Sequence, residues 1–304
     1  MVKNMPSTPK PQKRIQKSAG EIVFDFCNSV ILCVIGIAML YPFLYVLFAS
    51  ISDPYALFTE DFIFLLKPAG KIQFAAYRYV FANEQITTGF FNTAFYVVAG
   101  TAIGMFISTL GAYVLSRQNV LWKTPIMILI MFTMYFSGGL IPTYLTVKQF
   151  GMLNTVWAVL LPSAVSTTNM IILRSGFSSV PDALVESGRI DGASEWRILL
   201  RIILPLCIPT IAVISMYYAV RIWNSWFEAS IYLTKAELFP VQLVLRGILI
   251  VDETGSSALS MDGVLLDEVI KYAVIVVTIV PIIIIYPFIQ QYFVKGVMIG
   301  AVKG

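Results

Sequence analysis

The chain has 304 residues, of which 58% are apolar and only 12% are charged. A soluble domain carries about a quarter charged residues, so this composition argues against a soluble fold. The formal net charge is +4, but the basic residues are scattered at the edges of apolar runs and form no dense stripe. Nucleic acid is therefore not an expected partner.

Catalytic and metal chemistry are also disfavoured. The chain has no histidine, and its cysteines, Cys27, Cys33 and Cys207, lie in or beside apolar segments without CxxC spacing. We expect them to be small buried hydrophobes rather than disulfides or metal ligands. The chain also lacks a GxxxxGK[ST] phosphate loop and a nucleophile–base pair that includes histidine. No catalytic residue, metal site or bound cofactor is expected.

Six apolar segments are predicted to cross the membrane as helices, because each is long enough to span about 30 Å of hydrocarbon. They cover residues 23–49, 90–115, 125–145, 156–173, 202–220 and 272–293. The fourth is the least regular, because Pro162 and a cluster of polar residues interrupt it. The predicted fold is an all-α membrane protein, with a basic N-terminal segment at 1–22 and a six-helix transmembrane domain at 23–304.

The distribution of basic residues predicts that both termini are cytoplasmic. In that orientation the inner segments hold 13 of the 21 lysines and arginines, against 8 in the longer outer segments. This is the bias that the positive-inside rule describes. Two long outer loops are then expected at about 51–89 and 221–271.

The apolar segments contain almost no groups that could drive transport by themselves. An ion-coupled carrier needs ionisable groups within the membrane, and here such groups lie only at segment edges, as at Asp25, Arg221 and Lys271. A channel or carrier and a membrane enzyme therefore remain as alternatives of other classes. If the protein moves a solute uphill, another subunit must supply the energy.

The inner loop before the fifth segment is the most unusual stretch. Ser179, with Asp182 three residues later, is typical of a helix start. Gly192 should break this helix, and Ser194 can cap a second one. Leu184 and Val185 could face a partner or the membrane surface, whereas Asp182, Glu186 and Arg189 share a polar side. An ordinary amphipathic interfacial loop fits the spacing equally well.

This loop resembles the coupling loop of binding-protein-dependent ABC importer permeases. Their signature has Glu-Ala-Ala, a glycine four residues later and a closing Ile-x-Leu-Pro group. Here these places are taken by Glu186, Ser187, Gly188, Gly192, Ile202, Leu204 and Pro205. The stretch 189–194 is similar to the carbohydrate-uptake branch. Since Ser187 and Gly188 replace two alanines, helix propensity is lower, and the first helix is expected to be shorter or to depend more on its docked partner.

Further segments resemble the maltose-permease-like second subunit of that branch. They lie at 91–93, 142–145, 151–155, 291–296 and 300–304. The segments 223–226 and 239–245 look closest to members that import oligosaccharides and complex glycans. The resemblance thus covers nearly the whole chain.

The resemblance implies a type I ABC importer permease fold in the cell (inner or plasma) membrane of a prokaryote. It implies a second permease subunit, two ATPase subunits that hold ATP and Mg, and an extracytoplasmic solute-binding protein, within membrane lipid. The coupling loop, residues 178–203, would seat on an ATPase subunit. The residues expected to couple it are Asp182, Glu186, Ser187, Gly188, Arg189, Asp191, Gly192 and Ala193.

The resemblance also implies a sugar as the solute, most closely an oligosaccharide or glycan. Aromatic and small polar side chains suit sugars, which stack on rings and need hydrogen bonds. Candidates for lining the path are Tyr135, Phe136, Asn169, Tyr217, Tyr218 and Asn224, each of which could equally be a packed helix–helix residue. A peptide or amino-acid importer of the same superfamily is the nearer alternative, because it shares the coupling loop.

Overall fold

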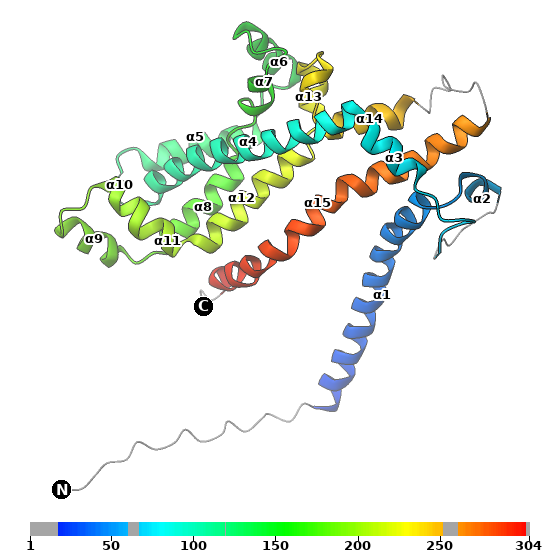
Figure 1. The fold of residues 1–304 in the computed structure, drawn as a ribbon. Helices are drawn as coiled ribbons and strands as arrows, with labels where there is room; N and C mark the ends of the chain where they lie inside the picture. The colour runs from blue at the N-terminus through cyan, green and yellow to red at the C-terminus, as the bar shows by residue number, and fades with distance from the viewer. Residues whose placement is uncertain (1–17, 60–66, 119, 252–260, 302–304) are drawn as a thin grey trace.

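The computed structural model describes residues 18–59, 67–118, 120–251 and 261–301, and within these ranges it is helical without a strand (Figure 1). The helices are α1 (Ala19–Ser50), α2 (Pro54–Thr59), α3 (Ala75–Ala82), α4 (Glu84–Ser116), α5 (Lys123–Tyr135), α6 (Leu140–Gln149), α7 (Val156–Leu160), α8 (Thr167–Ser178), α9 (Asp182–Ile190), α10 (Glu195–Ile198), α11 (Leu204–Leu206), α12 (Ile208–Trp223), α13 (Phe227–Tyr232), α14 (Val241–Val251) and α15 (Met261–Ala301). A π-helical turn, η1 (Leu199–Ile203), joins α10 to α11, and a 3₁₀ turn, η2 (Ala236–Leu238), precedes α14. The prediction of an all-α protein is confirmed for the described residues.

Helix α4 is the centre of the fold, where it packs against α8, α12 and α14. The backbones come close because α4 presents glycines to its neighbours. A Cβ atom at Gly104 would lie 2.8 Å from the carbonyl oxygen of Ala164 and 2.8 Å from the Tyr218 ring. Small residues of this kind allow the close helix packing that is common in membranes.

Two buried clusters lie along this centre. One, which we call the inner cluster, joins the C-terminal end of α4 to α8, α9, α12 and η1, and its largest fully buried side chains include Phe177, Ile198 and Tyr218. The other joins the start of α4 to α3, α14 and α15, around Val80, Ile86 and Val241. α4 therefore connects two separate cores.

The predicted membrane segments are only partly continuous helices. Among the described residues, Ala19–Ser50, Glu84–Ser116 and Glu268–Phe288 are long and apolar enough to cross a membrane, and counting each of two bent pairs as one span raises the number to five. The third predicted segment is broken after α5, so that α6 departs by 110°, and the fifth bends by 87° before α12. The fourth is interrupted between α7 and α8, where Pro162 lies. A set of six uninterrupted spans is therefore not what the chain forms.

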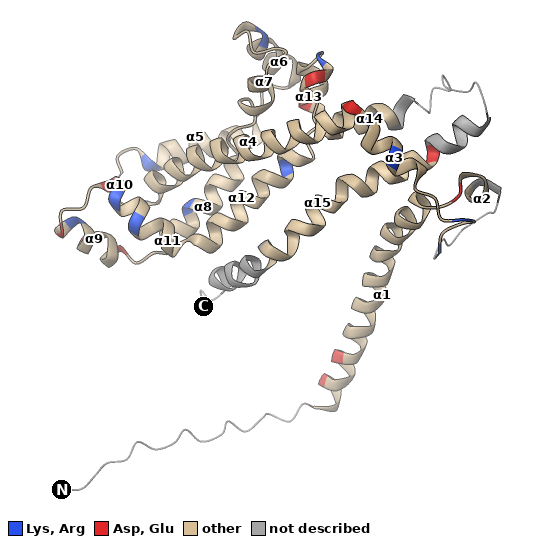
Figure 2. Ribbon diagram, viewed as in Figure 1, with Lys and Arg blue, Asp and Glu red and all other residues tan. Residues whose placement is uncertain are grey.

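Helix α1 extends away from the other helices and contacts them near its C-terminal end (Figure 1). Its most apolar stretch has no buried residue. Cys27 and Cys33 are exposed on it, contrary to the expectation of burial, whereas Cys207 is buried. Figure 2 shows that α1 carries acidic residues near its start and is otherwise free of charge along its described length, as a helix facing hydrocarbon must be.

Gly104 offers a test of the central packing. Because a methyl group there would meet a backbone carbonyl, we expect Gly104→Ala to cost about 1–3 kcal/mol of folding free energy. Gly36→Ala on α1 is the matched control, since a Cβ there meets nothing within 4 Å. The measurement is the thermal midpoint of the purified chain in detergent. Equal midpoints for the two variants would contradict this account of the packing.

Candidate functional site

The coupling loop contains two helices that begin at identifiable residues. α9 begins at Asp182 after Pro181, whose φ of −56° suits the approach to a helix. Ser179 does not cap it, because its hydroxyl donates to the carbonyl oxygen of Gly176 at 2.7 Å. α10 begins after Ser194, whose hydroxyl oxygen accepts from the amide of Arg197 at 3.4 Å. The predicted cap at Ser194 and the predicted helix start near Asp182 are confirmed, although Ser179 itself does not cap α9.

The break between the two helices depends on Gly192. Its φ is +77°, a left-handed conformation that L side chains rarely adopt. The amide of Gly192 donates to the carbonyl of Arg189 at 3.0 Å, and the amide of Ala193 donates to that of Gly188 at 2.9 Å. These bonds satisfy the end of α9, so the predicted helix–break–helix geometry is confirmed.

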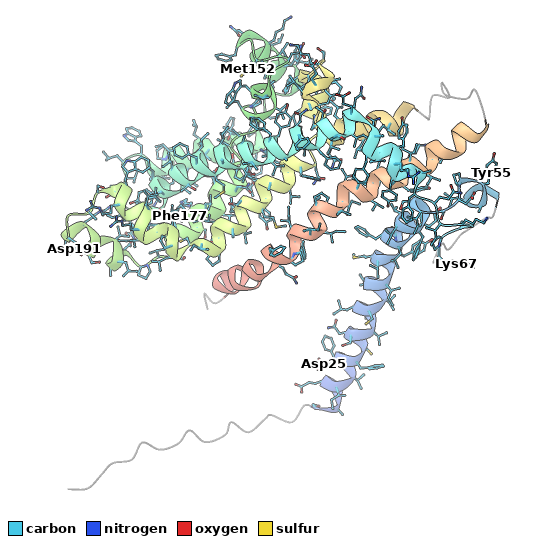
Figure 3. All side chains as sticks on the ribbon, in the orientation of Figure 1. Asp25, Tyr55, Lys67, Met152, Phe177 and Asp191 are labelled. Carbon is cyan, nitrogen blue, oxygen red and sulfur yellow. The ribbon has the colours of Figure 1, made fainter. Side chains whose placement is uncertain are left out.

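One side of α9 is buried against the rest of the loop. Val185 is 2% exposed within the inner cluster, so the expectation that it faces a partner or the membrane is wrong. Leu184, Ile190 and Trp196 remain exposed. The tip of the loop, marked by Asp191 in Figure 3, lies far from Tyr55 beyond the other end of α4.

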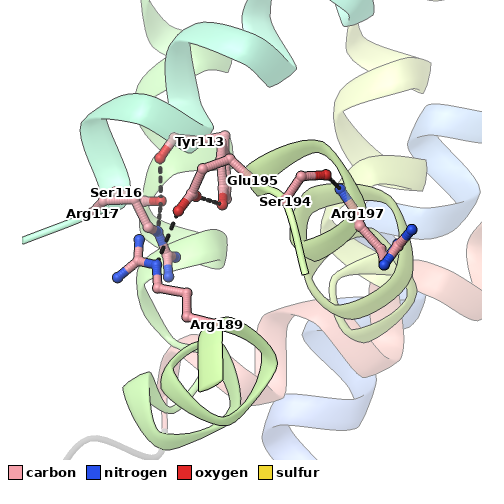
Figure 4. Close-up of polar contacts among 7 residues, drawn as sticks. All are labelled: Tyr113, Ser116, Arg117, Arg189, Ser194, Glu195 and Arg197. Atoms are coloured by element: carbon pink, nitrogen blue, oxygen red, sulfur yellow. Dashed lines mark hydrogen bonds and ion pairs between the residues drawn. The ribbon is translucent and has the colours of Figure 1, made fainter. Parts of the chain in front are cut away.

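A single carboxylate brings three helices together at this site (Figure 4). The Tyr113 hydroxyl, on the last turn of α4, donates to Glu195 Oε2 at 2.5 Å. Glu195 Oε1 accepts from Arg189 Nε of α9 at 2.9 Å. The sequence analysis did not single out Glu195 or Tyr113, because no spacing rule relates residues that are 82 positions apart.

The same end of α4 is tied to α8 by two arginines. The buried Arg117 donates from Nη2 to the carbonyl oxygen of Phe177 at 2.9 Å and from Nε to the hydroxyl of Ser116 at 3.0 Å (Figure 4). In the reverse direction, Arg174 Nε donates to the carbonyl oxygen of Leu115 at 3.0 Å. Both carbonyls lie at helix C-terminal ends, where backbone acceptors have no partner within the helix.

Charged and polar side chains line a pocket of about 510 Å³ between the end of α4 and α9. Its lining residues include Tyr113, Arg117, Asp182, Glu186, Arg189 and Glu195. Gln118 also lines this pocket, and its Nε2 donates to Asp182 Oδ2 at 2.8 Å. The three residues predicted to share the polar side of α9 are thus on one pocket wall.

The contacts of Glu195 also set its acid–base properties. The hydrogen bond from Tyr113, followed by that from Arg189, stabilises the charged form and lowers the pKa of the Glu195 carboxyl. The hydrogen bond between Arg189 and Glu195 raises the pKa of the Arg189 guanidinium. Both side chains are about half exposed, at 44% and 54%, so water screens their attraction and the ion pair contributes little stability.

The remaining residues expected to couple the loop lie on its exposed surface or inside it. Ser187 is exposed and its hydroxyl donates to the carbonyl of Leu184, while Asp191 is exposed at the break. Gly188 is buried, and a Cβ there would lie 3.0 Å from Ile202 Cδ1. Among the described residues no group of three or more His, Cys, Asp or Glu side chains could hold a metal.

The residues predicted to line a path are not brought together at one place. Tyr135 and Phe136 are exposed beside the α5–α6 break, where Phe136 stacks on Phe132 with centroids 4.3 Å apart. Asn169 and Tyr218 are buried inside the chain.

Two further predicted path residues lie along α12 and at its end. Tyr217 is 44% exposed on α12. Asn224 follows α12 and lines a pocket of about 190 Å³ with Ser163, Arg221 and Trp226.

The N-terminal half of α4 holds the loop before α14 through three side chains. Asn92 Nδ2 donates to the carbonyl oxygens of Glu237 and Phe239 at 2.7 and 3.1 Å. Tyr96 donates to that of Leu238 at 2.8 Å. We call Asn92, Thr93 and Tyr96 the outer clamp. Apart from the resemblance at 91–93, no pattern in the sequence predicts this clamp.

Thr93 completes the clamp from a fully buried position. Its hydroxyl donates to the carbonyl of Gly89 at 2.8 Å and accepts from the amide of Val241 at 2.9 Å. The first amide of α14 is thereby satisfied without water.

The chain matches a family of known proteins and several individual relatives over most of its length. The model of the family described as "Binding-protein-dependent transport system inner membrane component" matches residues 96–299. The chain is 39% identical over 285 residues to the Bacillus subtilis (strain 168) "Polygalacturonan/rhamnogalacturonan transport system permease protein YtcP", covering 93% of this chain and 99% of that protein. It is also 39% identical over 284 residues to "Protein LplC" of the same organism, covering 93% and 95%.

Solved structures agree with these relatives. A chain in "Crystal structure of a bacterial ABC transporter involved in the import of the acidic polysaccharide alginate" matches with a TM-score of 0.83 and 30% identity, covering 92% of this chain and 100% of that one. A chain in a complex of bacterial alginate ABC transporter with "alginate pentasaccharide-bound periplasmic protein" matches with a TM-score of 0.59 at 19% identity and shows the fold alone.

Thr93 provides a test of the outer clamp. Thr93→Val preserves shape but leaves the buried amide of Val241 without an acceptor, which should cost about 1–3 kcal/mol. Thr93→Ser keeps the hydroxyl and is the matched control. Thermal unfolding in detergent should give a clearly lower midpoint for the valine variant than for the serine variant, and the opposite order would contradict the assigned bond.

Proposed function

Since the chain belongs to the family of binding-protein-dependent transport system inner membrane components, we propose that it is one permease subunit of an ATP-driven importer of oligosaccharides. It provides part of the path through the membrane and receives work from ATPase subunits through its coupling loop. The chain itself is not an enzyme.

The coupling loop is the observation that carries the proposal. Two short helices meet at the left-handed Gly192, and α9 presents exposed Leu184 and Ile190 beside Asp182 and Glu186. Exposed apolar side chains within a charged surface are typical of a protein contact. The loop follows directly on α8 and runs into α12, so a partner that displaces it displaces the membrane helices.

The relatives support a saccharide as the solute. One matched protein is named a polygalacturonan and rhamnogalacturonan transport permease, and a further relative from Halalkalibacterium halodurans, 25% identical over 256 residues, is named an arabinooligosaccharides transport permease. The solved structure at 30% identity is of a transporter that imports alginate. These names favour an oligosaccharide over the peptide or amino-acid alternative that shares the coupling loop.

The assembly proposed for this chain follows from the same membership. It contains a second permease subunit, two ATPase subunits that hold ATP and Mg, and an extracytoplasmic solute-binding protein. The complex lies in the inner or plasma membrane of a prokaryote, with both termini of this chain and the coupling loop on the cytoplasmic side. The bent pairs α5–α6 and α10–α12 would each serve as one crossing, and the interrupted stretch α7–α8 as another, together with the continuous helices α1, α4 and α15.

The proposed mechanism is rigid-body transmission between two states. ATP-driven closure of the ATPase subunits would carry the coupling loop with it, and the helices attached to the loop would change from an inward-facing to an outward-facing arrangement. Such a lever works only if the loop keeps its shape under load. Gly192 is then the residue on which the shape depends.

We therefore expect side chains at Gly192 to uncouple ATP hydrolysis from transport in the assembled complex. A Cβ there meets nothing within 4 Å, so the cost is that of the left-handed backbone alone, about 1–2 kcal/mol. Gly192→Val should lower the solute transported per ATP several-fold. Gly192→Asn should retain most of it, because asparagine tolerates this conformation.

Gly151→Val is the matched control for this series. Gly151 also has a positive φ, +67°, with nothing within 4 Å, but it lies between α6 and α7, away from the coupling loop. It should lose comparable stability without uncoupling. Wild-type coupling in Gly192→Val complexes would refute the assignment of this loop.

The solute class is tested with the reconstituted complex and its solute-binding protein. Uronate oligosaccharides, neutral oligosaccharides and short peptides are offered as radiolabelled solutes to proteoliposomes that contain ATP. We expect uptake of a saccharide that stops without ATP or without this chain. Uptake of peptides alone would refute the saccharide assignment and leave the importer assignment standing.

A further inference from the structure

The coupling loop is joined covalently to α8 at its start and to α12 at its end, and the route to α12 is bent. From α10 the chain passes through the π-helical turn η1 and then bends by 87° beside Cys207 before α12 begins. Pro205 and Pro209 flank this bend. A π turn and prolines interrupt the regular hydrogen-bond ladder of a helix. Displacement of the loop is therefore transmitted along this route through a joint.

A third connection is the side-chain contact to α4. Glu195 is the first residue of α10, and its carboxylate binds Tyr113 on the last turn of α4 as well as Arg189 on α9. α4 runs for 33 residues without a break or an internal proline. Displacement that enters α4 at Tyr113 is thus carried along one continuous helix.

From these connections, and resting on the proposed function, we propose that Glu195 and Tyr113 are a positioning pair. They attach both helices of the coupling loop to α4, so that ATP-driven motion of the loop moves α4 as one body with it. The partner of the loop is thereby linked to the centre of the fold and not only to α8 and α12.

The environment of the pair favours a geometric role over a stabilising one. Tyr113 is only 7% exposed, and its ring belongs to the inner cluster with Val185 and Ile198, so its hydroxyl is held in place. The guanidinium of Arg117 lies 5.4 Å from the centre of that ring. Glu195, in contrast, is half exposed, and losing its ion pair costs little stability.

A parallel contact restrains rotation about the pair. Gln118, two residues after the end of α4, donates to Asp182 at the start of α9. α4 thus meets the first residue of each helix in the coupling loop, Asp182 of α9 and Glu195 of α10. Two separated attachment points fix the orientation of a rigid body better than one.

Motion given to α4 reaches the other side of the molecule through the outer clamp. Its three side chains hold the backbone of residues 237–241 by hydrogen bonds. The outer loop before α14 is therefore attached to the same helix as the coupling loop. The Tyr113–Glu195 pair is therefore proposed to affect the position of the loop before α14 as well as that of α4.

The first test separates hydroxyl from ring in the assembled complex. Tyr113→Phe keeps the packed ring and removes the bond, and should lower the solute transported per ATP at least three-fold while assembly and thermal midpoint stay near wild type. Glu195→Ala should match it, and Glu195→Gln, which retains an acceptor for the Tyr113 hydroxyl, should recover most of the coupling. The combination of Tyr113→Phe with Glu195→Ala should be no worse than either alone. Tyr79→Phe, on half-exposed Tyr79 of α3, is the matched control.

A cross-link tests the same point without removing the contact. Tyr113→Cys and Glu195→Cys are introduced together after Cys27→Ser, Cys33→Ser and Cys207→Ala, and joined by a short reducible bis-thiosulfonate reagent. Restored coupling in the cross-linked complex, lost again on reduction, is expected if loop and α4 move together. A cross-link that blocks transport until it is reduced would overturn the proposal even if Tyr113→Phe failed to fold.

The outcomes also separate this proposal from the proposed function. Wild-type coupling in Tyr113→Phe complexes, with Gly192→Val still uncoupled, would overturn the positioning pair and leave the importer assignment intact. Wild-type coupling in both variants would refute the coupling role of the loop altogether.

Discussion

The close approach of α4 to α8 and α12 is the constraint on which the other contacts of this structure depend. At Gly104 the carbonyl of Ala164 and the ring of Tyr218 occupy the space that a side chain would need. Because the backbones are that close, the Tyr218 hydroxyl lies 2.6 Å from the Ser108 hydroxyl and accepts from the amide of Ser166 at 2.9 Å. That amide lies at the break before α8, and an unpaired backbone group in hydrocarbon would cost several kcal/mol. The glycine on one helix therefore makes the interruption on another tolerable.

Hydropathy predicted the long helices and failed at the breaks, for a physical reason. A run of twenty apolar residues has one backbone solution in lipid, so α1, α4 and much of α15 followed from composition. Hydropathy gives no information on the direction of the helix axis, and the third predicted segment averages apolar although α6 departs by 110° after Ser137, Gly138 and Gly139. The departure is stabilised by contacts distant in sequence, such as Tyr144 stacked on Tyr232 with centroids 6.3 Å apart.

At the candidate site, too, local features were predictable from the sequence and contacts distant in sequence were not. The break at Gly192 and the cap at Ser194 were predictable because each depends on one residue and its immediate neighbours. The burial of Val185 was not, because the face that a short helix buries is decided by what packs on it. The bond between Tyr113 and Glu195, like that between Thr93 and the amide of Val241, joins residues 82 or 148 positions apart. A single sequence carries no local signal for such pairs.

Two exposed apolar surfaces, that of α1 and that around Tyr135 and Phe136 at the end of α5, differ in what must cover them. Hydrocarbon tails are as apolar as leucine, so α1 can face lipid along its whole exposed length without cost. The surface where α5 leads into residues 136–139 cannot face lipid in this way. These residues lie outside both α5 and α6, and helix ends carry backbone groups with no partner in the helix. Irregular backbone at membrane depth is tolerated only within protein or beside a water-filled cavity. Of the two surfaces, the one around Tyr135 and Phe136 therefore needs a second subunit or an aqueous path beside it. The proposed function includes both a second permease subunit and a path for the solute.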